Sequence, residues 1–208
     1  MAVISISQNL VWIDCEMTGL NPDLDSLVEI AVVITDSELN VIDEGIDLVI
    51  KPTDASVANM NDFVRNMHTE SGLIEEFDAG LSLDEAQKLV LEYIKRHVPN
   101  AKEAPLAGNT IGTDRLFISK YLPEVDAHLH YRSIDVSSIK ELSRRWYPRV
   151  YFQMPKKDGG HRALADILES IRELRYYRET VFVNLPGPTS AEAQLAAEKV
   201  SRIDATHS

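Results

Sequence analysis

The chain has 208 residues, and its 33 Asp and Glu outnumber its 21 Lys and Arg, which gives a formal net charge of −12. This length allows one domain with a substantial core, and the sequence has no run of about eighteen apolar residues that would predict a membrane helix. The acidic charge argues against binding to long duplex nucleic acid, because such binding comes from neutralising many phosphates. A short or small anionic substrate held at one local site is compatible with it.

The sequence also bears on the compartment in which the protein works. Its single cysteine, Cys15, cannot form a disulfide within the chain. The first eight residues lack the basic start and the apolar middle of a signal peptide. We therefore expect a cytoplasmic protein with no membrane partner.

A short strand near the start of the chain carries the first candidate functional residues. Leu10 to Ile13 are apolar and rich in β-forming residues, which predicts a buried strand. Asp14 and Glu16 follow two residues apart, so both carboxylates lie on one face of the strand and Cys15 lies on the other. Two carboxylates this close repel each other unless a cation lies between them. The alternative interpretation is a solvated strand end.

The next part of the chain predicts more strands and then a helix. Apolar runs at 27–34 and 41–50 predict a second and a third strand, and their short connections favour an antiparallel meander. The mixed, polar stretch at 56–79 predicts short helices and loops. Ser82 and Glu85 form a capping box before an amphipathic helix, whose expected buried residues are Ala86, Leu89, Val90, Tyr93 and Ile94.

Helices alternate with two further short strands in the second half of the chain. The pattern predicts two strands, at 104–108 and 131–135. It predicts three helices: one around 116–121, one from the Ser138/Glu141 capping box to Trp146, and one at 162–178. A loop is expected at 148–160, which contains Lys156, Lys157, Gly159 and Gly160. Three strands followed by such an alternation predict an α/β sandwich with a mixed sheet.

The composition changes after Phe182. Residues 184–188 form a Pro- and Gly-containing linker, and a capping box at Thr189 and Glu192 predicts one short helix beyond it. This segment has too few large apolar residues to form a core. We therefore expect one domain at 1–183 and a flexible or loosely docked tail at 184–208.

Three polar residues later in the chain are further candidates for the site. Asp114 follows a glycine-containing turn at the start of a helix, where a lone Asp often serves as an N-cap. Asp166 lies near the start of the last long helix, and His161 precedes it by five residues. On one continuous helix this spacing would separate the two side chains by about 140°. His161 can therefore share a site with Asp166 only if it lies on the loop before the helix.

Together these residues resemble the DEDD-type 3′→5′ exonucleases of the histidine subclass. The Asp-x-Glu of the first strand, the Asp of GNTIGTDR and the His and Asp of HRALAD match the three family motifs in order. Longer segments are similar to a member of that family that acts on very short RNA, and they cover about residues 9–180: WIDCEMTGL, NMHTESGL, GNTIGTDR, HYRSIDVSSIKELSRRWYP and HRALADILESIRELRYYR. The resemblance implies a ribonuclease H-like exonuclease fold, with a mixed five-stranded sheet flanked by helices.

The chemistry of the matched residues agrees with that family. Four carboxylates can balance the charge of two divalent cations, Mg²⁺ or Mn²⁺, which prefer hard oxygen ligands; they are Asp14, Glu16, Asp114 and Asp166. Two such ions can stabilise the attacking and the leaving oxygen of an in-line phosphodiester displacement. His161, with a reference pKa of about 6.5, can accept the proton of the attacking water near neutral pH. The resemblance implies that His161 is the general base and that nucleoside 5′-monophosphates leave from a 3′ end.

The resemblance also implies residues that bind the substrate. Leu20 corresponds to a residue that wedges against the bases, and Phe63 stands where the family commonly has a stacking Trp. A pocket that caps the 5′ phosphate, and so favours dinucleotides, would consist of His68, Thr110, Arg132 and Ser137. Tyr131 corresponds to a residue that reaches the active site of a partner subunit, which implies a homodimer.

Two other functions are compatible with the sequence. The chain could be a proofreading or repair exonuclease of the same superfamily that acts on DNA, or a module that binds nucleotides without cleaving them. Such a module would not need all four carboxylates and the histidine, and all five are present. A local excess of positive charge between Arg132 and Arg162, where eight Lys and Arg stand against three acidic residues, could attract a small anionic substrate.

Overall fold

A computed structural model describes residues 8–156 and 160–205 of the chain. The predicted loop at 148–160 is therefore described only in part, because Lys157 and Gly159 lie outside the described residues, as do residues 1–7 of the N-terminal segment. Among the described residues, none of the helices combines the length and the apolar character that crossing a bilayer requires.

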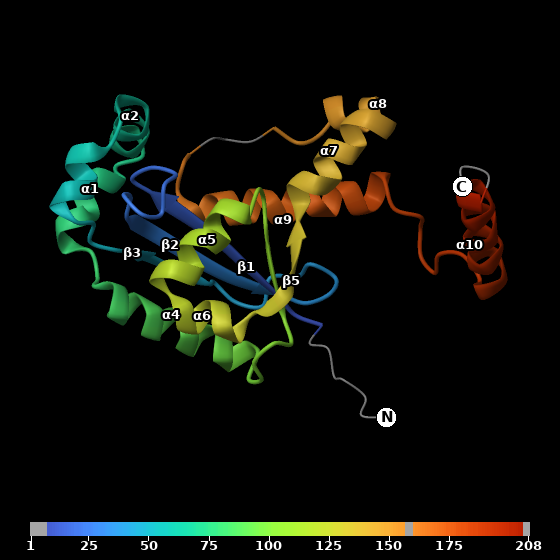
Figure 1. Ribbon diagram of the computed structural model, residues 1–208, viewed down its shortest axis with the longest axis horizontal. Coiled ribbons are helices and arrows are strands. Elements are labelled where there is room, and N and C mark those ends of the chain that lie inside the picture. Colours follow the sequence, from blue (N-terminus) through green and yellow to red (C-terminus); the bar gives the residue numbers. More distant parts are fainter. Residues whose placement is uncertain (1–7, 157–159, 206–208) are drawn as a thin grey trace.

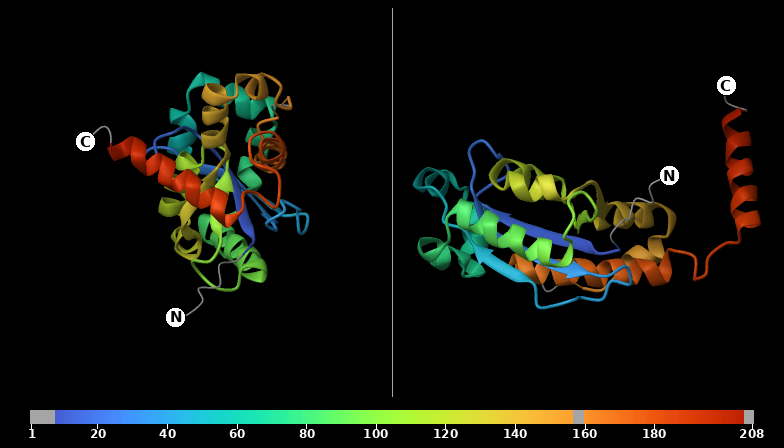
Figure 2. Two further views of the ribbon diagram at one scale, coloured as in Figure 1. Left: turned by 90° about the vertical axis from the view of Figure 1, so that its right-hand side faces the viewer. Right: turned by 90° about the horizontal axis from the view of Figure 1, so that it is seen from below.

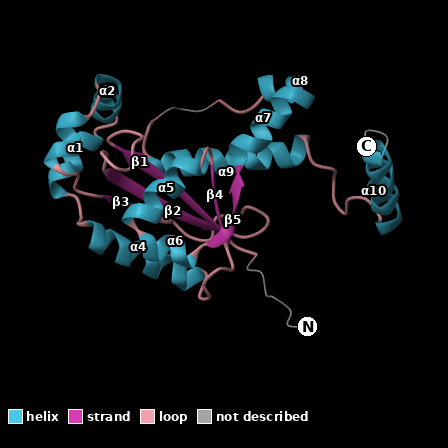
Figure 3. Cartoon of the chain, viewed as in Figure 1, coloured by secondary structure: helices cyan, strands magenta, loops and turns pink. Residues whose placement is uncertain are grey.

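The centre of the fold is the predicted mixed sheet of five strands (Figures 1 and 3). The strands are β1 (Leu10–Met17), β2 (Leu27–Thr35), β3 (Ile46–Val49), β4 (Pro105–Gly108) and β5 (His130–Asp135). Their order is β3-β2-β1-β4-β5. The pairs β1–β2 and β2–β3 are antiparallel, which confirms the predicted meander, whereas β4 is parallel to both β1 and β5.

The third strand is shorter than the predicted span of 41–50. Gly45 has a φ of +77°, and its N–H donates to Asp43 Oδ1 at 3.0 Å, so a turn interrupts the strand. A Cβ at this position would lie 2.7 Å from the carbonyl oxygen of Val32, and therefore only glycine fits. Beyond β3 itself, Val41 and Ile50 form isolated bridges.

Helices cover both faces of the sheet (Figure 2). They are α1 (Asp54–Asn59), α2 (Asp62–Glu70), α3 (Leu73–Glu76), the 3₁₀ turn η1 (Phe77–Ala79), α4 (Leu83–His97), α5 (Gly112–Tyr121), α6 (Pro123–His128), α7 (Val136–Trp146), α8 (Pro148–Phe152), α9 (Ala163–Thr180) and α10 (Ser190–Ala205). One core joins Val11 and Ile13 of β1 to α4, α5 and α6, and a second joins Trp12 to Ile167 and Ile171 of α9. The sheet therefore lies between two apolar layers, as an α/β sandwich requires.

Some details of the predicted helices are wrong. In α4, Leu89 is 42% exposed and Leu91 is buried in its place, although the Ser82/Glu85 capping box is present. The N-cap of α7 is Asp135, which accepts the N–H of Ser137, and not Ser138. This difference arises because β5 runs directly into α7, so the last residue of the strand supplies the cap. The helices α6 and α8, each with Pro at its N-terminus, lie in stretches where no helix was predicted.

The C-terminal helix α10 stands apart from the sheet and its covering helices (Figures 1 and 2). Its predicted capping box is present, because the N–H of Glu192 donates to Thr189 Oγ1 and the N–H of Thr189 donates to a Glu192 carboxylate oxygen. Leu195 and Val200 are exposed. The mobility of this tail, and the division of the chain into 1–183 and 184–208, remain predictions.

Candidate active site

Three acidic side chains meet where β1 passes the first turn of α9. Asp14 and Glu16 come from β1 and Asp166 comes from α9, and each offers a carboxylate oxygen within 4.8 Å of the other two. Since α9 packs against β1 and β2, residues about 150 positions apart in the sequence are brought together. Figure 1 shows this N-terminal end of α9 beside the sheet and its other end leading toward α10.

The strand alternation places the two acids of β1 on the side of α9. Val11, Ile13 and Cys15 belong to the apolar core under α4, whereas Trp12 belongs to the core under α9. Successive residues of a strand point to opposite faces, so Asp14 and Glu16 lie on the opposite face from Val11, Ile13 and Cys15. They therefore lie on the same face as Trp12, which is the face that α9 covers. The prediction that Cys15 is a core residue on the opposite face is confirmed.

Asp114 lies next to this cluster, on the third residue of α5. Its Oδ1 accepts the backbone N–H of Cys15 at 3.0 Å, and the residue is 7% exposed. The N-cap of α5 is Ile111, so the alternative role of Asp114 as an N-cap is wrong. The strand β4, which leads to α5, is the neighbour of β1 in the sheet, and this brings the carboxylate of Asp114 to the backbone between the two acids of β1.

The electrostatics of the cluster favour a bound cation. Burial, and then the charges of Asp114, Asp166 and Glu16, raise the pKa of Asp14 well above its ordinary value. Burial and the neighbouring carboxylates raise the pKa of Glu16 to about 8, and burial raises the pKa of Asp114 to about 6. A divalent cation would remove this repulsion. The oxygen donors of Asp14, Glu16 and Asp166, with Asp114 beside them, fit Mg²⁺ or Mn²⁺.

His161 lies on the loop before α9. This is the position that the sequence required if His161 and Asp166 are to share a site. The helix begins at Ala163, and His161 is exposed with a φ of +46°. His68, another of the predicted site residues, is buried on α2. Burial lowers the pKa of His68, and the charge of His161 acts in the same direction, whereas the hydrogen bond to Met17 and the charge of Glu29 oppose it. His68 also lies near the acids, because its Nδ1 is 4.0 Å from Glu16 Oε2 and its Nε2 is 2.9 Å from the carbonyl oxygen of Met17.

The four residues predicted to cap a 5′ phosphate lie at three places in the structure. Thr110 and Ser137 are brought together by Asp135, whose Oδ1 accepts the N–H of Thr110 at 3.0 Å and the N–H and hydroxyl of Ser137 at 2.9 and 2.6 Å. Arg132 lies exposed on β5, with its guanidinium 5.5 Å from the ring centroid of Tyr131. His68 contacts Met17 and Glu16 instead, on the side of the acids.

The three apolar residues predicted to contact the substrate or a partner are all exposed. Leu20 in the turn after β1 and Phe63 on α2 are each 77% exposed, and Tyr131 on β5 is 72% exposed. Tyr131 also lies on an edge strand of the sheet, where a second chain could approach it.

Two acidic residues of this region were not among the predicted site residues. Glu29 is fully buried on β2, as the third residue of the strand, in register with Glu16 of β1. Asp135 joins Thr110 to Ser137 as described above. A glutamate inside the otherwise apolar strand LVEIAVVIT was a signal for Glu29, because a buried charge needs a partner. The role of Asp135 follows from the packing of β4 beside β5, which has no equivalent signal in the sequence.

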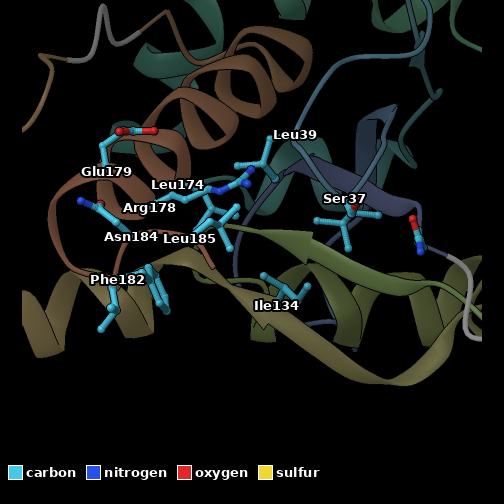
Figure 4. A pocket seen from close by; sticks show the side chains of 12 residues that line it. Ser37, Leu39, Ile134, Leu174, Arg178, Glu179, Phe182, Asn184 and Leu185 are labelled. Carbon is cyan, nitrogen blue, oxygen red and sulfur yellow. The ribbon is translucent and has the colours of Figure 1, made fainter. Parts of the chain in front are cut away.

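An apolar pocket lies at the other end of α9 (Figure 4). It has a volume of about 680 Å³ and is lined in part by Leu39, Ile134, Leu174 and Leu185. Leu174 is eight residues beyond Asp166, or about 12 Å along the helix. The pocket is thus separate from the acidic cluster, and it lies where the chain leaves α9 for α10.

Comparisons with known proteins agree with the geometry of the cluster. A model of the exonuclease family RNase_T matches residues 11–174. The oligoribonuclease of Leifsonia xyli subsp. xyli is 64% identical over 194 residues, which cover 93% of this chain and 94% of that one. The chain belongs to the oligoribonuclease family. Other oligoribonucleases are similar. The oligoribonuclease of Streptomyces avermitilis is 55% identical over 93% of this chain and 97% of the relative. The oligoribonuclease of Cutibacterium acnes is 57% identical over 91% of this chain and 94% of the relative.

Solved structures of other exonucleases have the same fold as this member of the oligoribonuclease family. E. coli exonuclease I in complex with a dT13 oligonucleotide superposes with a TM-score of 0.66 at 17% identity, and exonuclease I from Methylocaldum szegediense with a TM-score of 0.58 at 20% identity. Each match covers 83% of this chain, which spans only 41% of those longer chains. The predicted exonuclease fold of the ribonuclease H-like type is confirmed.

Proposed function

We propose that this protein is a metal-dependent 3′→5′ exoribonuclease of the cytoplasm that hydrolyses very short RNA, above all dinucleotides, to nucleoside 5′-monophosphates. The observation that carries this proposal is the convergence of Asp14, Glu16 and Asp166 within 4.8 Å, in a chain of the oligoribonuclease family. Burial and mutual repulsion raise the pKa of these β1 carboxylates, and an anionic site of this kind is suited to binding cations rather than to packing.

Four carboxylates, those of Asp14, Glu16, Asp114 and Asp166, would hold two divalent cations, Mg²⁺ or Mn²⁺. When bound, the ions supply the positive charge that stabilises the pentacoordinate phosphate of the transition state. The chain itself supplies the geometry, since Asp114 is fixed by its hydrogen bond to the N–H of Cys15 and the acids of β1 are fixed by the sheet. A rigid frame of this kind keeps the scissile phosphate in line for attack.

The proton of the attacking water would pass to His161. Its ring lies on an exposed loop at the start of α9, next to the helix that carries Asp166. His68, whose pKa is lowered by burial, would remain neutral beside Glu16 and could hold the substrate without competing for this proton.

The substrate would lie between the carboxylates and the residues around Asp135. Leu20 and Phe63 offer exposed apolar surfaces against which two bases can stack. Arg132, Thr110 and Ser137 would bind the 5′ phosphate near Asp135, and His68 would contact the substrate on the side of the acids; such a limit on length favours the dinucleotide. The acidic charge of −12 supports a short substrate, because a long polyanion would gain nothing from the remaining surface.

The protein would act as a homodimer in which Tyr131 of each chain reaches the active site of the other. The exposure of Tyr131 on the edge strand β5 supports this arrangement. Light scattering should give the mass of a dimer, and Tyr131→Ala should lower kcat without changing the thermal midpoint. A stable and fully active monomer would refute the role of Tyr131 across the interface.

A time course on 5′-labelled RNAs of two to seven nucleotides, with Mn²⁺ and with EDTA, tests the proposal directly. We expect the diribonucleotide to be cleaved fastest and EDTA to stop all cleavage. Matched DNA oligonucleotides test the alternative of a DNA exonuclease, and a strong preference for DNA would overturn the proposed substrate. Tight binding of RNA without turnover in either metal would indicate a binding module instead.

A further inference from the structure

We propose that Glu29 is a positioning residue that fixes His161 by holding the first residues of α9. The inference rests on the proposed function, because it takes His161 as the general base. Glu29 lies on β2, fully buried, in a strand that is otherwise apolar except for its terminal Thr35. A carboxylate in such a place is costly unless its oxygens are paired.

Both oxygens of Glu29 are paired with the two residues that directly follow His161. Glu29 Oε1 accepts the Nε–H of Arg162 at 2.6 Å, and Glu29 Oε2 accepts the backbone N–H of Ala163 at 2.9 Å. One bond therefore holds a side chain and the other holds the main chain. Both carboxylate oxygens of Glu29 therefore hold the segment that follows His161.

The helix α9 depends on this bond for its N-terminal cap. Its N-cap residue is Arg162, whose side chain makes no capping hydrogen bond. The first N–H groups of a helix need acceptors from elsewhere, and a negative charge is favoured at this positive end of the helix dipole. Glu29 supplies both from the neighbouring strand β2.

His161 needs such support because its backbone is strained. A φ of +46° is uncommon for a residue with a side chain and persists only where the surroundings enforce it. Arg162 adds a second anchor, since its NH1 group donates to Glu76 Oε1 at 2.8 Å. The planar guanidinium thus joins β2 to α3 immediately beside His161, and a lysine could not replace both bonds.

A double-mutant cycle with Glu29→Gln and His161→Ala tests the inference. Glutamine keeps the size of the side chain and removes the charge that pairs with Arg162. If Glu29 acts through His161, Glu29→Gln should lower kcat on a diribonucleotide by about 10- to 100-fold and leave KM within about threefold, as expected for a displaced catalytic group. In the His161→Ala background, the same substitution should change kcat by less than about twofold. An equal loss in both backgrounds would overturn the inference.

Arg162 offers a second test at a residue whose own side chain is 30% exposed. We expect Arg162→Gln to lower kcat by about tenfold and Arg162→Lys to recover part of that loss. The matched control is Arg178→Gln, which removes an ion pair to Glu38 at the opposite end of the same helix. A similar loss of kcat in Arg178→Gln would show a general weakening of α9 and would overturn the inference.

The cycle also separates this inference from the proposed function. If His161→Ala keeps the kcat of the unaltered protein, the assignment of His161 as the base is wrong, and the inference fails with it. If His161→Ala lowers kcat strongly while Glu29→Gln has no effect, the proposed function stands and only the role of Glu29 is refuted. Thermal melting of each variant in EDTA confirms that the measured rates belong to folded protein.

Discussion

The two ends of α9 differ in what they contribute to the molecule. At the N-terminal end, Asp166 meets Asp14 and Glu16, and buried charges of one sign raise the pKa of the β1 acids. At the C-terminal end, Leu174 and Tyr177 pack in the core, the buried Glu173 is paired with Lys140 and Asn109, and Arg178 pairs with Glu38 nearer the surface. Apolar burial stabilises the fold, whereas clustered carboxylates destabilise it until a cation binds.

This difference indicates that one end of α9 serves the active site and the other end serves the stability of the fold. The apolar end and the core along its length would hold α9 on the sheet firmly enough to tolerate repulsion at the acidic end. Functional sites often carry such local destabilisation. Changes at the acidic end should therefore affect catalysis, and changes at the apolar end should affect stability.

The largest effect is expected from Asp14→Asn at the acidic end. The substitution keeps the shape of the side chain and removes one charge that the proposed cations would need, so kcat should fall by about a thousandfold. The thermal midpoint in EDTA should rise, because the repulsion among the acids decreases. Steady-state kinetics on a diribonucleotide and calorimetry measure the two changes. Normal activity, or a lower midpoint in EDTA, would contradict the comparison.

At the apolar end, Leu174→Ala should cost about 2–4 kcal/mol of unfolding free energy through lost burial and a new cavity. The variant should keep kcat near that of the unaltered protein at low temperature, because Leu174 lies far along the helix from Asp166. Urea unfolding and kinetics check the two parts. The matched control is Leu168→Ala on the same helix, which is 48% exposed and should cost about 1 kcal/mol or less.

A smaller effect is expected from pH on the metal-free protein. The pKa of Glu16 is raised from 4.5 to about 8, so the folded chain keeps a proton that the unfolded chain releases. Stability without metal should therefore fall as the pH rises from 4.5 toward 8. Mn²⁺ should raise the thermal midpoint more at the upper end of this range than at the lower end. A midpoint in EDTA that rises with pH over the range would refute the raised pKa.

The smallest effect is expected from removing α10. Its hydrogen bonds and ion pair, as described, join residues of its own segment. A chain ending at Pro188 keeps the apolar pocket of α9 and should lose less than about 0.5 kcal/mol of unfolding free energy. Its kcat should be unchanged. A drop in the thermal midpoint or in kcat would show that α10 packs on another part of the protein or on a second copy.

Much of this arrangement could be predicted from local patterns. The alternation of β1 places Asp14 and Glu16 on one face and Cys15 on the other, and the structure agrees. The spacing of His161 and Asp166 requires a loop before α9, and the helix does begin after His161. The extent of β3 was predicted less well, because the turn at Gly45 depends on the close approach of the Val32 backbone.

The amino-acid sequence by itself determined the order of the strands and of the longer helices, the acidic pair of β1 and the match to the exonuclease motifs. Tertiary structure decided which carboxylates meet, that Asp114 bonds to the N–H of Cys15, and that Glu29 caps α9. The physical reason is the range of the interactions. Periodicity and capping act between near neighbours in the chain, whereas the charges of the site are set by burial and by contacts between segments that only the packed sheet brings together.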